Sequence, residues 1–258
     1  MPFLDLASHR IEYERIKVTP DARSTLVFLH EGLGSTAMWR DFPERVARAT
    51  QRDAVVYSRY GYGNSDSLTE PRTVRYMHDE ALIVLPQLLD RLAIDAPILI
   101  GHSDGGSIAL IHAGSGARAV GAVVTLAAHV LVEDISVASI TAAKTDYETT
   151  DLRARLARYH ADVDSAFWGW NRIWLAPEFR DWNIEEYLPR IGCPVLSIQG
   201  EDDEYGTMEQ MRRIATGVRD VELLALENCR HSPHRDQPGA VLAAIGGFVA
   251  RKVPLSGS

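Results

Sequence analysis

One stretch decides the fold expected of this chain: Leu99-Ile100-Gly101-His102-Ser103-Asp104-Gly105-Gly106. An apolar run ends here in the pattern Gly-x-Ser-x-Gly, and the segment 107–111 that follows is compatible with a helix. This order is typical of a nucleophile elbow, a sharp turn between a strand and a helix that presents a serine hydroxyl. Glycine suits both sides of the serine because side chains there would collide as strand and helix close together. Chance alone places the pattern in about one chain in ten of this length, so its context must decide its meaning.

The composition limits the class of protein. The 258 residues, 46% of them hydrophobic, fit one large domain or one domain with a large insertion. A net charge of -8 without clustered Lys and Arg argues against a nucleic-acid partner. There is no cluster of metal ligands, no run long enough to span a membrane and no leader-like start after Met1. We therefore expect a cytoplasmic protein without metal, cofactor or membrane partner. Only the tail 254–258 has a composition that suggests disorder. The composition leaves open whether the protein forms a homo-oligomer.

Apolar runs and helix-compatible segments alternate along most of the chain. The expected buried strands are 26–30, 54–58, 97–101, 120–127, 195–200 and 221–226. The expected helices are 38–49, 74–92 with a kink at Pro86, 107–113, 208–217 and 238–251. The alternating segment 10–18 suits an antiparallel edge strand that opens the sheet. This rhythm predicts an α/β fold, a mostly parallel sheet with helices on both faces and the site at the carboxyl ends of its strands.

The alternation of expected strands and helices stops between residues 131 and 189. This segment is polar and helical in pattern, lacks a clear buried strand, and holds four of the five tryptophans: Trp168, Trp170, Trp174 and Trp182. An excursion of this kind inside a regular α/β order is typical of a helical cap that closes over a site. We therefore expect residues 1–130 and 190–258 to form the core, and residues 131–189 to form a cap inserted into it.

A serine hydroxyl becomes a good nucleophile only beside a histidine that is itself oriented by an acid. The loop after the strand 195–200 offers Glu201, Asp202 and Asp203 as acids. The loop after the strand 221–226 offers two histidines, His231 and His234. Both loops leave the same edge of the predicted sheet as the elbow. The order serine, acid, histidine along the chain is the one associated with strand-turn-helix nucleophiles.

Several motifs in this order give the sequence a family likeness. They are His30-Glu31-Gly32-Leu33-Gly34-Ser35 with Trp39, then 61–66, 101–106, 200–203 and His231-Ser232-Pro233. With them the sequence resembles the α/β-hydrolase superfamily, in particular its capped esterases and lactonases. The resemblance covers nearly the whole chain outside the expected cap. It implies an α/β-hydrolase fold with a helical cap insertion.

The resemblance also implies roles for individual residues. Ser103 would be the nucleophile, His231 the general base, and Asp203 the acid, because the family places its carboxylate three residues after the glycine. The backbone N–H groups of Gly32 and Asp104 would form the oxyanion hole. One position departs from the family, since Glu31 follows His30 where a glycine is usual.

The substrate pocket is less determined by the motifs. The side chain of Glu31 would narrow the pocket, pair with a cation away from it, or supply an acid. Phe167, Trp168 and Trp174 are candidates to line an apolar pocket, although helical spacing also suits plain packing of the tryptophans. The Asp104 side chain either faces the pocket, where it would favour a cationic or hydrogen-bond-donating substrate, or is a solvated or capping residue.

The sequence thus predicts a serine hydrolase that cleaves a small-molecule acyl substrate, an ester or lactone, through an acyl-enzyme intermediate. Two alternatives within enzymes use the same triad: carbon-carbon bond hydrolysis of ring-cleavage products, and thioester hydrolysis. An alternative of another class is a low-turnover ligand-binding receptor on the same fold. A serine at position 103, where dehalogenases of this fold carry an aspartate, argues against haloalkane dehalogenation.

Overall fold

An eight-stranded sheet runs through the computed structural model, which describes residues 2–18 and 24–255. Its strands are β1 (Phe3–Leu6), β2 (His9–Ile16), β3 (Leu26–Leu29), β4 (Ala54–Tyr57), β5 (Ile98–His102), β6 (Ala122–Leu126), β7 (Val195–Gly200) and β8 (Val221–Leu226). Their order across the sheet is β1-β2-β4-β3-β5-β6-β7-β8. All neighbours from β4 to β8 are parallel, whereas β2 is antiparallel to both β1 and β4. Residues 256–258 of the tail expected to be disordered lie outside the described part.

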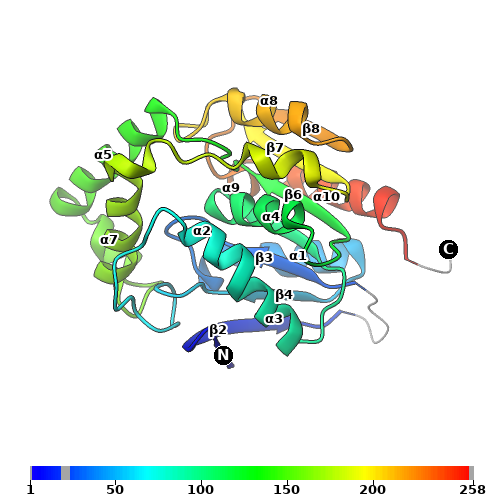
Figure 1. Cartoon of the computed structure of the whole chain (residues 1–258), viewed down its shortest axis with the longest axis horizontal. Coiled ribbons are helices and arrows are strands. Elements are labelled where there is room, and N and C mark those ends of the chain that lie inside the picture. Colours follow the sequence, from blue (N-terminus) through cyan, green and yellow to red (C-terminus); the bar gives the residue numbers. More distant parts are fainter. Residues whose placement is uncertain (1, 19–23, 256–258) are drawn as a thin grey trace.

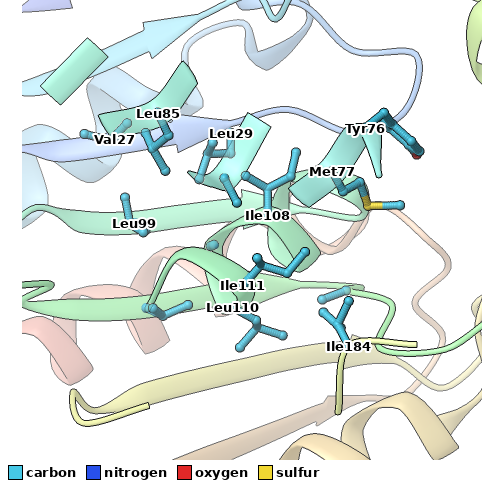
Figure 2. Packing of buried hydrophobic residues seen from close by; sticks show 14 of the residues in the cluster. Val27, Leu29, Tyr76, Met77, Leu85, Leu99, Ile108, Leu110, Ile111 and Ile184 are labelled. Atoms are coloured by element: carbon cyan, nitrogen blue, oxygen red, sulfur yellow. The ribbon is translucent and has the colours of Figure 1, made fainter. Parts of the chain in front are cut away.

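The central strands are apolar on both faces because helices cover both. Along β3, Leu26 and Phe28 join one hydrophobic cluster, while Val27 and Leu29 join the other. The first cluster lies beneath α1 (Phe42–Thr50) and α10 (Pro238–Lys252). The second lies beneath α3 (Leu85–Arg91) and α4 (Asp104–Ser115), as Figure 2 shows. The predicted α/β class and mostly parallel sheet are therefore confirmed.

The prediction that the segment 10–18 forms the edge of the sheet is wrong. β2 lies between β1 and β4, so β1 is the edge strand on this side. The charged residue Glu12 explains the misreading, because it is buried in β2 and accepts hydrogen bonds from Ser58 Oγ at 2.8 Å and Asn64 N at 3.0 Å. The charged residue Glu12 in this strand is therefore a buried, hydrogen-bonded group and does not indicate a solvent-exposed edge strand.

The expected helix 74–92 is divided at its proline. It consists of α2 (Tyr76–Asp79), a π-helical turn (Glu80–Val84) and α3. Pro86 has no N–H to donate to the preceding turn, which favours a break in the regular hydrogen-bond ladder. The carbonyl of Ala81 in the π turn accepts a hydrogen bond from His112 Nδ1 of α4 at 2.8 Å instead. This bond fixes the π-helical turn against α4.

The helix expected over 38–49 also begins differently. A 3-10 turn covers Thr36–Trp39, and the α-helix α1 starts only at Phe42. Arg40 between them has a positive φ of 54°, which interrupts the helix. Pro43 lies in the first turn of α1, where a missing N–H costs nothing.

Helices fill the segment between β6 and β7. They are α5 (Asp134–Thr149), α6 (Leu152–Leu156) and α7 (Val163–Trp174), followed by 3-10 turns at Pro177–Phe179 and Glu185–Arg190. Figure 1 shows α5 and α7 standing to one side of the sheet. The remaining helices are α8 (Met208–Gly217) and the short α9 (Pro233–Asp236). In the part of the chain described, no helix has both the length and the apolar character needed to cross a membrane.

Candidate active site

The elbow around Ser103 is a strained turn. Ser103 follows β5 directly, precedes α4, and has φ 52° and ψ -120°, a conformation that costs a non-glycine residue energy. Its backbone is held by a hydrogen bond from its N–H to Leu126 O at 2.8 Å. The flanking glycines permit the turn, because a β-carbon on Gly101 would lie 2.1 Å from Gly105 O, and one on Gly105 would lie 2.0 Å from Leu29 O. Ser103 itself is 6% exposed.

Asp203 and His231 form a hydrogen-bonded pair at the ends of β7 and β8. Asp203 Oδ1 lies 2.8 Å from His231 Nδ1, and because a carboxylate only accepts, Nδ1 is the donor and Nε2 takes no part in this bond. Asp203 also accepts hydrogen bonds from Gln199 Nε2 at 2.6 Å and Tyr205 N at 2.8 Å. Burial alone would raise the pKa of Asp203, but the hydrogen bond and charge of His231 lower it below its usual value.

The other acids and the second histidine of these loops are placed differently. Glu201 and Asp202 are exposed, so of the three acids only Asp203 meets His231. His234 is buried and packs against the rings of Trp39 at 4.9 Å and Phe42 at 5.3 Å. Burial lowers its pKa well below the usual value, so its ring is a neutral packing group.

Three rings surround the imidazole of His231. Tyr205 lies 4.7 Å away between centroids, His102 lies 5.1 Å away, and His129 lies 5.8 Å away. Burial lowers the pKa of His129 to about 4, so this ring is neutral near pH 7. Ser103 Oγ forms no hydrogen bond within residues 2–18 and 24–255, so the structure brings Asp203 and His231 together while leaving the serine hydroxyl unbonded.

The two residues predicted to supply backbone N–H groups, Asp104 and Gly32, lie in different elements. Asp104 is the first residue of α4, so its N–H has no acceptor within the helix. Gly32 lies in the loop after β3 and is covered directly by Trp170 of α7, whose Nε1 lies 2.2 Å from the position a β-carbon on Gly32 would take. Only glycine therefore fits beneath this tryptophan.

His30 and Arg59 hold the loop that carries Gly32 through hydrogen bonds. His30 Nδ1 donates to the Glu31 carbonyl at 2.7 Å, and His30 Nε2 accepts from the N–H of Arg59 at 3.0 Å. Arg59 Nη2 donates to the same Glu31 carbonyl at 2.8 Å. Burial and the charge of Arg59 lower the pKa of His30 well below its usual value. His30 is thus a neutral structural group.

The Asp104 side chain is fully buried in a polar network that reaches α7. Asp104 Oδ2 accepts a hydrogen bond from Tyr76 OH at 2.7 Å and lies 3.6 Å from Arg59 Nη2. Tyr76 OH in turn accepts from Trp174 Nε1 at 3.0 Å. Trp174 also packs edge to face on His129, with 5.1 Å between ring centroids. Of the aromatic residues predicted to line a pocket, Trp174 is therefore the one connected to the elbow.

The other two predicted pocket residues, Phe167 and Trp168, pack among the helices of the 131–189 segment. Phe167 stacks on Tyr147 of α5 at 3.7 Å, and Trp168 meets the same ring edge to face at 5.6 Å. Trp168 also lines a cavity of about 560 Å³ between α7 and the 68–72 loop. The lining of that cavity does not include Ser103.

The side chain of Glu31 reaches the elbow and α9. Its carboxylate lies 3.4 Å from His102 Nδ1 and 3.7 Å from Arg235 Nη2, at the junction between the elbow and α9. Of the roles considered from the sequence, the contacts fit pairing with a cation. In the described ranges no group of three His, Cys, Asp or Glu side chains is arranged to hold a metal ion.

Sequence reasoning missed four residues near the elbow: Arg59, Tyr76, His129 and Trp170. His129 carried a usable signal, because it follows a buried strand at the same edge as Ser103. Trp170 did not, since helical spacing leaves open which side of α7 faces the sheet. Its contact with Gly32 depends on how α7 is seated.

Comparisons with known proteins agree with this architecture. A model of the alpha/beta hydrolase family matches residues 26–245. The putative carbamate hydrolase RutD of Caulobacter sp. (strain K31) is 26% identical over 264 residues, which cover 92% of this chain and 95% of that protein. The proline iminopeptidase of Lactobacillus acidophilus is 31% identical over 112 residues. That match covers 43% of this chain and spans only 36% of the length of the peptidase.

Solved structures are similar over almost the whole chain. A carboxylesterase from the ammonia-oxidizing thaumarchaeon Nitrososphaera gargenis superposes with a TM-score of 0.78 at 22% identity, covering 97% of this chain and 98% of the other. The enol-lactonase from Burkholderia xenovorans LB400 gives 0.77 at 18% identity, with 96% and 100% covered. At such identities the likeness establishes the fold alone.

Proposed function

Since this chain belongs to the alpha/beta hydrolase family, we propose that it is a serine hydrolase that cleaves a small carboxylic ester or lactone through an acyl-enzyme intermediate. The observation that carries the proposal is the strained turn at Ser103, with φ 52°, at the carboxyl ends of the strands, where Asp203 also hydrogen-bonds His231. Strain of this kind is retained where it positions a reacting group. The hydrogen bond from Nδ1 to Asp203 leaves His231 Nε2 ready to take a proton.

The proposed reaction proceeds in two halves. Ser103 Oγ attacks the substrate carbonyl while His231 Nε2 accepts the hydroxyl proton, and the carbonyl oxygen becomes an oxyanion. Collapse of this intermediate breaks the bond to the leaving alkoxide, which takes the proton from His231. Water then attacks the acyl-enzyme with His231 again as base, and the acid product leaves as Ser103 regains its proton.

We assign the oxyanion to the backbone N–H groups of Gly32 and Asp104. The N–H of Asp104 at the start of α4 is free of an intrahelical acceptor, and the N-terminal end of a helix favours negative charge. A preorganised donor of this kind contributes about 3 kcal/mol to the transition state. Asp203 stays ionised, because its lowered pKa keeps it able to stabilise the charged histidine ring.

We further propose that residues 131–189 act as a cap on a core formed by 1–130 and 190–258. Two contacts of α7 support this division: Trp170 covers Gly32, and Trp174 donates to Tyr76 beside Asp104. Both contacts lie next to the proposed oxyanion hole. Access of substrate to Ser103 would then depend on the position of α7 relative to the core.

Covalent labelling tests the proposal. A fluorophosphonate probe is expected to modify Ser103, because only an activated serine reacts, and Ser103→Ala is expected to abolish labelling with an unchanged unfolding temperature. A panel of p-nitrophenyl esters, lactones, acyl-CoA thioesters, prolyl amides and vinylogous diketones then identifies the bond cleaved. Absence of labelling in a folded wild-type protein would contradict the proposal and favour the ligand-binding receptor. Turnover retained by Ser103→Ala would refute the mechanism.

A further inference from the structure

Glu31 occupies a place where three parts of the site meet. Its carboxylate is 16% exposed and lies 3.4 Å from His102 Nδ1, a distance longer than that of a well-formed hydrogen bond. On its other side Arg235 Nη2 of α9 lies 3.7 Å away and also donates to Met38 O at 2.9 Å. Glu31 thus connects the loop after β3, the elbow and the helix after His231.

His102 has a second partner. Its Nε2 lies 2.7 Å from the backbone carbonyl oxygen of His231, and because a carbonyl only accepts, Nε2 carries a proton and donates. The ring of His102 is 2% exposed, so this bond is shielded from water. His102 therefore holds the main chain of His231 from the residue immediately before Ser103.

The two partners of His102 lie on opposite sides of its ring. Burial would raise the pKa of Glu31, but His102 and Arg235 lower it well below its usual value, so the carboxylate is ionised and accepts only. The ionised carboxylate thus lies on the Nδ1 side of the His102 ring, and the carbonyl of His231 lies on its Nε2 side. The other groups that face this ring are His231 at 5.1 Å, the neutral His234 at 4.9 Å and Trp39 at 6.3 Å.

We propose that Glu31 is a positioning residue, which orients the ring of His102 so that the hydrogen bond from its Nε2 fixes the carbonyl of His231. This inference rests on the proposed function, because it assigns His231 as the base whose position matters. The side chain of His231 is fixed at Nδ1 by Asp203. Its main-chain carbonyl accepts from His102, and its N–H donates to Glu204 Oε2 at 3.2 Å. The departure from glycine at position 31 then acts on catalysis through His102, without contact between Glu31 and substrate.

The hydrogen bond from His102 is tested without any substrate. Side-chain ¹H–¹⁵N correlation spectra of ¹⁵N-histidine-labelled protein at pH 7 are expected to show a slowly exchanging Nε2–H on one buried ring, and His102→Asn assigns it by its disappearance. Glu31→Gln is expected to shift this signal and to speed its exchange with water. A His102 ring without a proton on Nε2 in the wild-type protein, or a signal that Glu31→Gln leaves unchanged, would overturn the proposal whether or not the protein is a serine hydrolase.

Kinetics on an ester of the panel test the positioning role. Glu31→Ala is expected to lower kcat about ten- to a hundredfold with KM changed less than threefold, because small misplacements of a catalytic group have effects of this size. Glu31→Gln retains a polar partner for His102 and is expected to lose less. Glu44→Gln is the matched control: it removes an exposed carboxylate paired with Arg48 at 2.7 Å and leaves both constants unchanged.

A double variant separates this role from a general loss of packing. If Glu31 acts through His102, Glu31→Gln combined with His102→Asn has the kcat of His102→Asn alone. Additive losses in kcat, or a rise in KM at constant kcat for Glu31→Ala, would refute the proposal. If the wild-type protein fails to react with the fluorophosphonate probe, the proposed function fails, while the spectra still decide the state of His102.

Discussion

Replacing Gly105 by alanine tests whether the elbow depends on close approach of two backbones. Gly105 lies in the first turn of α4, and a β-carbon there would stand 2.0 Å from the carbonyl oxygen of Leu29, 2.4 Å from its carbonyl carbon and 2.8 Å from His30 O. These atoms belong to the end of β3 and the loop after it, so they cannot rotate away as a side chain would. The helix and the strand must separate by more than 1 Å to restore ordinary contact.

The magnitude follows from that displacement. Overpacking of a well-filled interior costs about 1–3 kcal/mol, and a backbone clash of this depth belongs at the upper end or beyond. We expect Gly105→Ala to lower the free energy of unfolding by about 3 kcal/mol and the unfolding temperature by about 6–12 °C. Gly246→Ala is the matched control, because no atom lies within 4 Å of its added carbon and it sits inside α10. There the same substitution is expected to stabilise by about 0.5–1 kcal/mol.

Urea unfolding followed by tryptophan fluorescence measures both variants in one experiment. Gly105→Ala and Gly246→Ala are expected to change the free energy of unfolding in opposite directions, with the transition slopes unchanged. A Gly105→Ala protein within 0.5 kcal/mol of the wild type would show that α4 can be reseated at little cost. The elbow would then not be held by this contact.

Three further predictions concern individual side chains. Asp203→Asn is expected to lower kcat on a cleaved ester about 10⁴-fold, because an amide favours the wrong tautomer of His231. Asp202→Asn, which changes an exposed side chain, is expected to leave kcat unchanged. Equal effects of the two variants on kcat would reject the assignment of Asp203. Tyr76→Phe removes the 2.7 Å hydrogen bond to Asp104, and urea unfolding is expected to show a loss of about 1–3 kcal/mol. Burial lowers the pKa of His129 to about 4. As the pH is lowered from about 6.5 to 4, the His129 ring therefore takes up a proton in the unfolded chain but not in the folded one. The free energy of unfolding accordingly decreases as the pH is lowered through this range. His129→Asn is expected to make that fall shallower by about one proton; an unchanged pH dependence of the unfolding free energy would contradict it.

Segments bounded by clear turn residues were predictable to the residue. The strands β7 and β8 and the helix α8 have the expected bounds 195–200, 221–226 and 208–217. Each is a short apolar or amphipathic run between polar or glycine-containing loops, so local chemistry alone specifies where it begins and ends. The loops that bring Asp203 and His231 together follow from these bounds, because parallel strands end at one edge.

Features that depend on contacts between distant segments were not predictable. The strand β1 has only Phe3–Leu6, and its place at the edge is set by pairing with β2 rather than by its own pattern. Which tryptophan of α7 reaches the elbow depends on the rotation of that helix, and spacing treats Trp168 and Trp170 alike until Gly32 is placed beneath one of them. The role of Glu31 likewise depends on His102 and Arg235, which are distant in sequence.

The two carboxylates beside the proposed oxyanion hole share one electrostatic arrangement. Glu31 and Asp104 each adjoin a proposed N–H donor, and an uncompensated negative charge there would oppose a developing oxyanion. At about 4 Å, two unit charges in a partly buried site interact by about 4 kcal/mol, more than one oxyanion donor contributes. Each carboxylate has an arginine near it: Arg235 lies 3.7 Å from Glu31, and Arg59 lies 3.6 Å from Asp104. The arginines therefore matter to the proposed chemistry without touching the substrate, because they let acidic side chains position the elbow while the donors still face a locally neutral site.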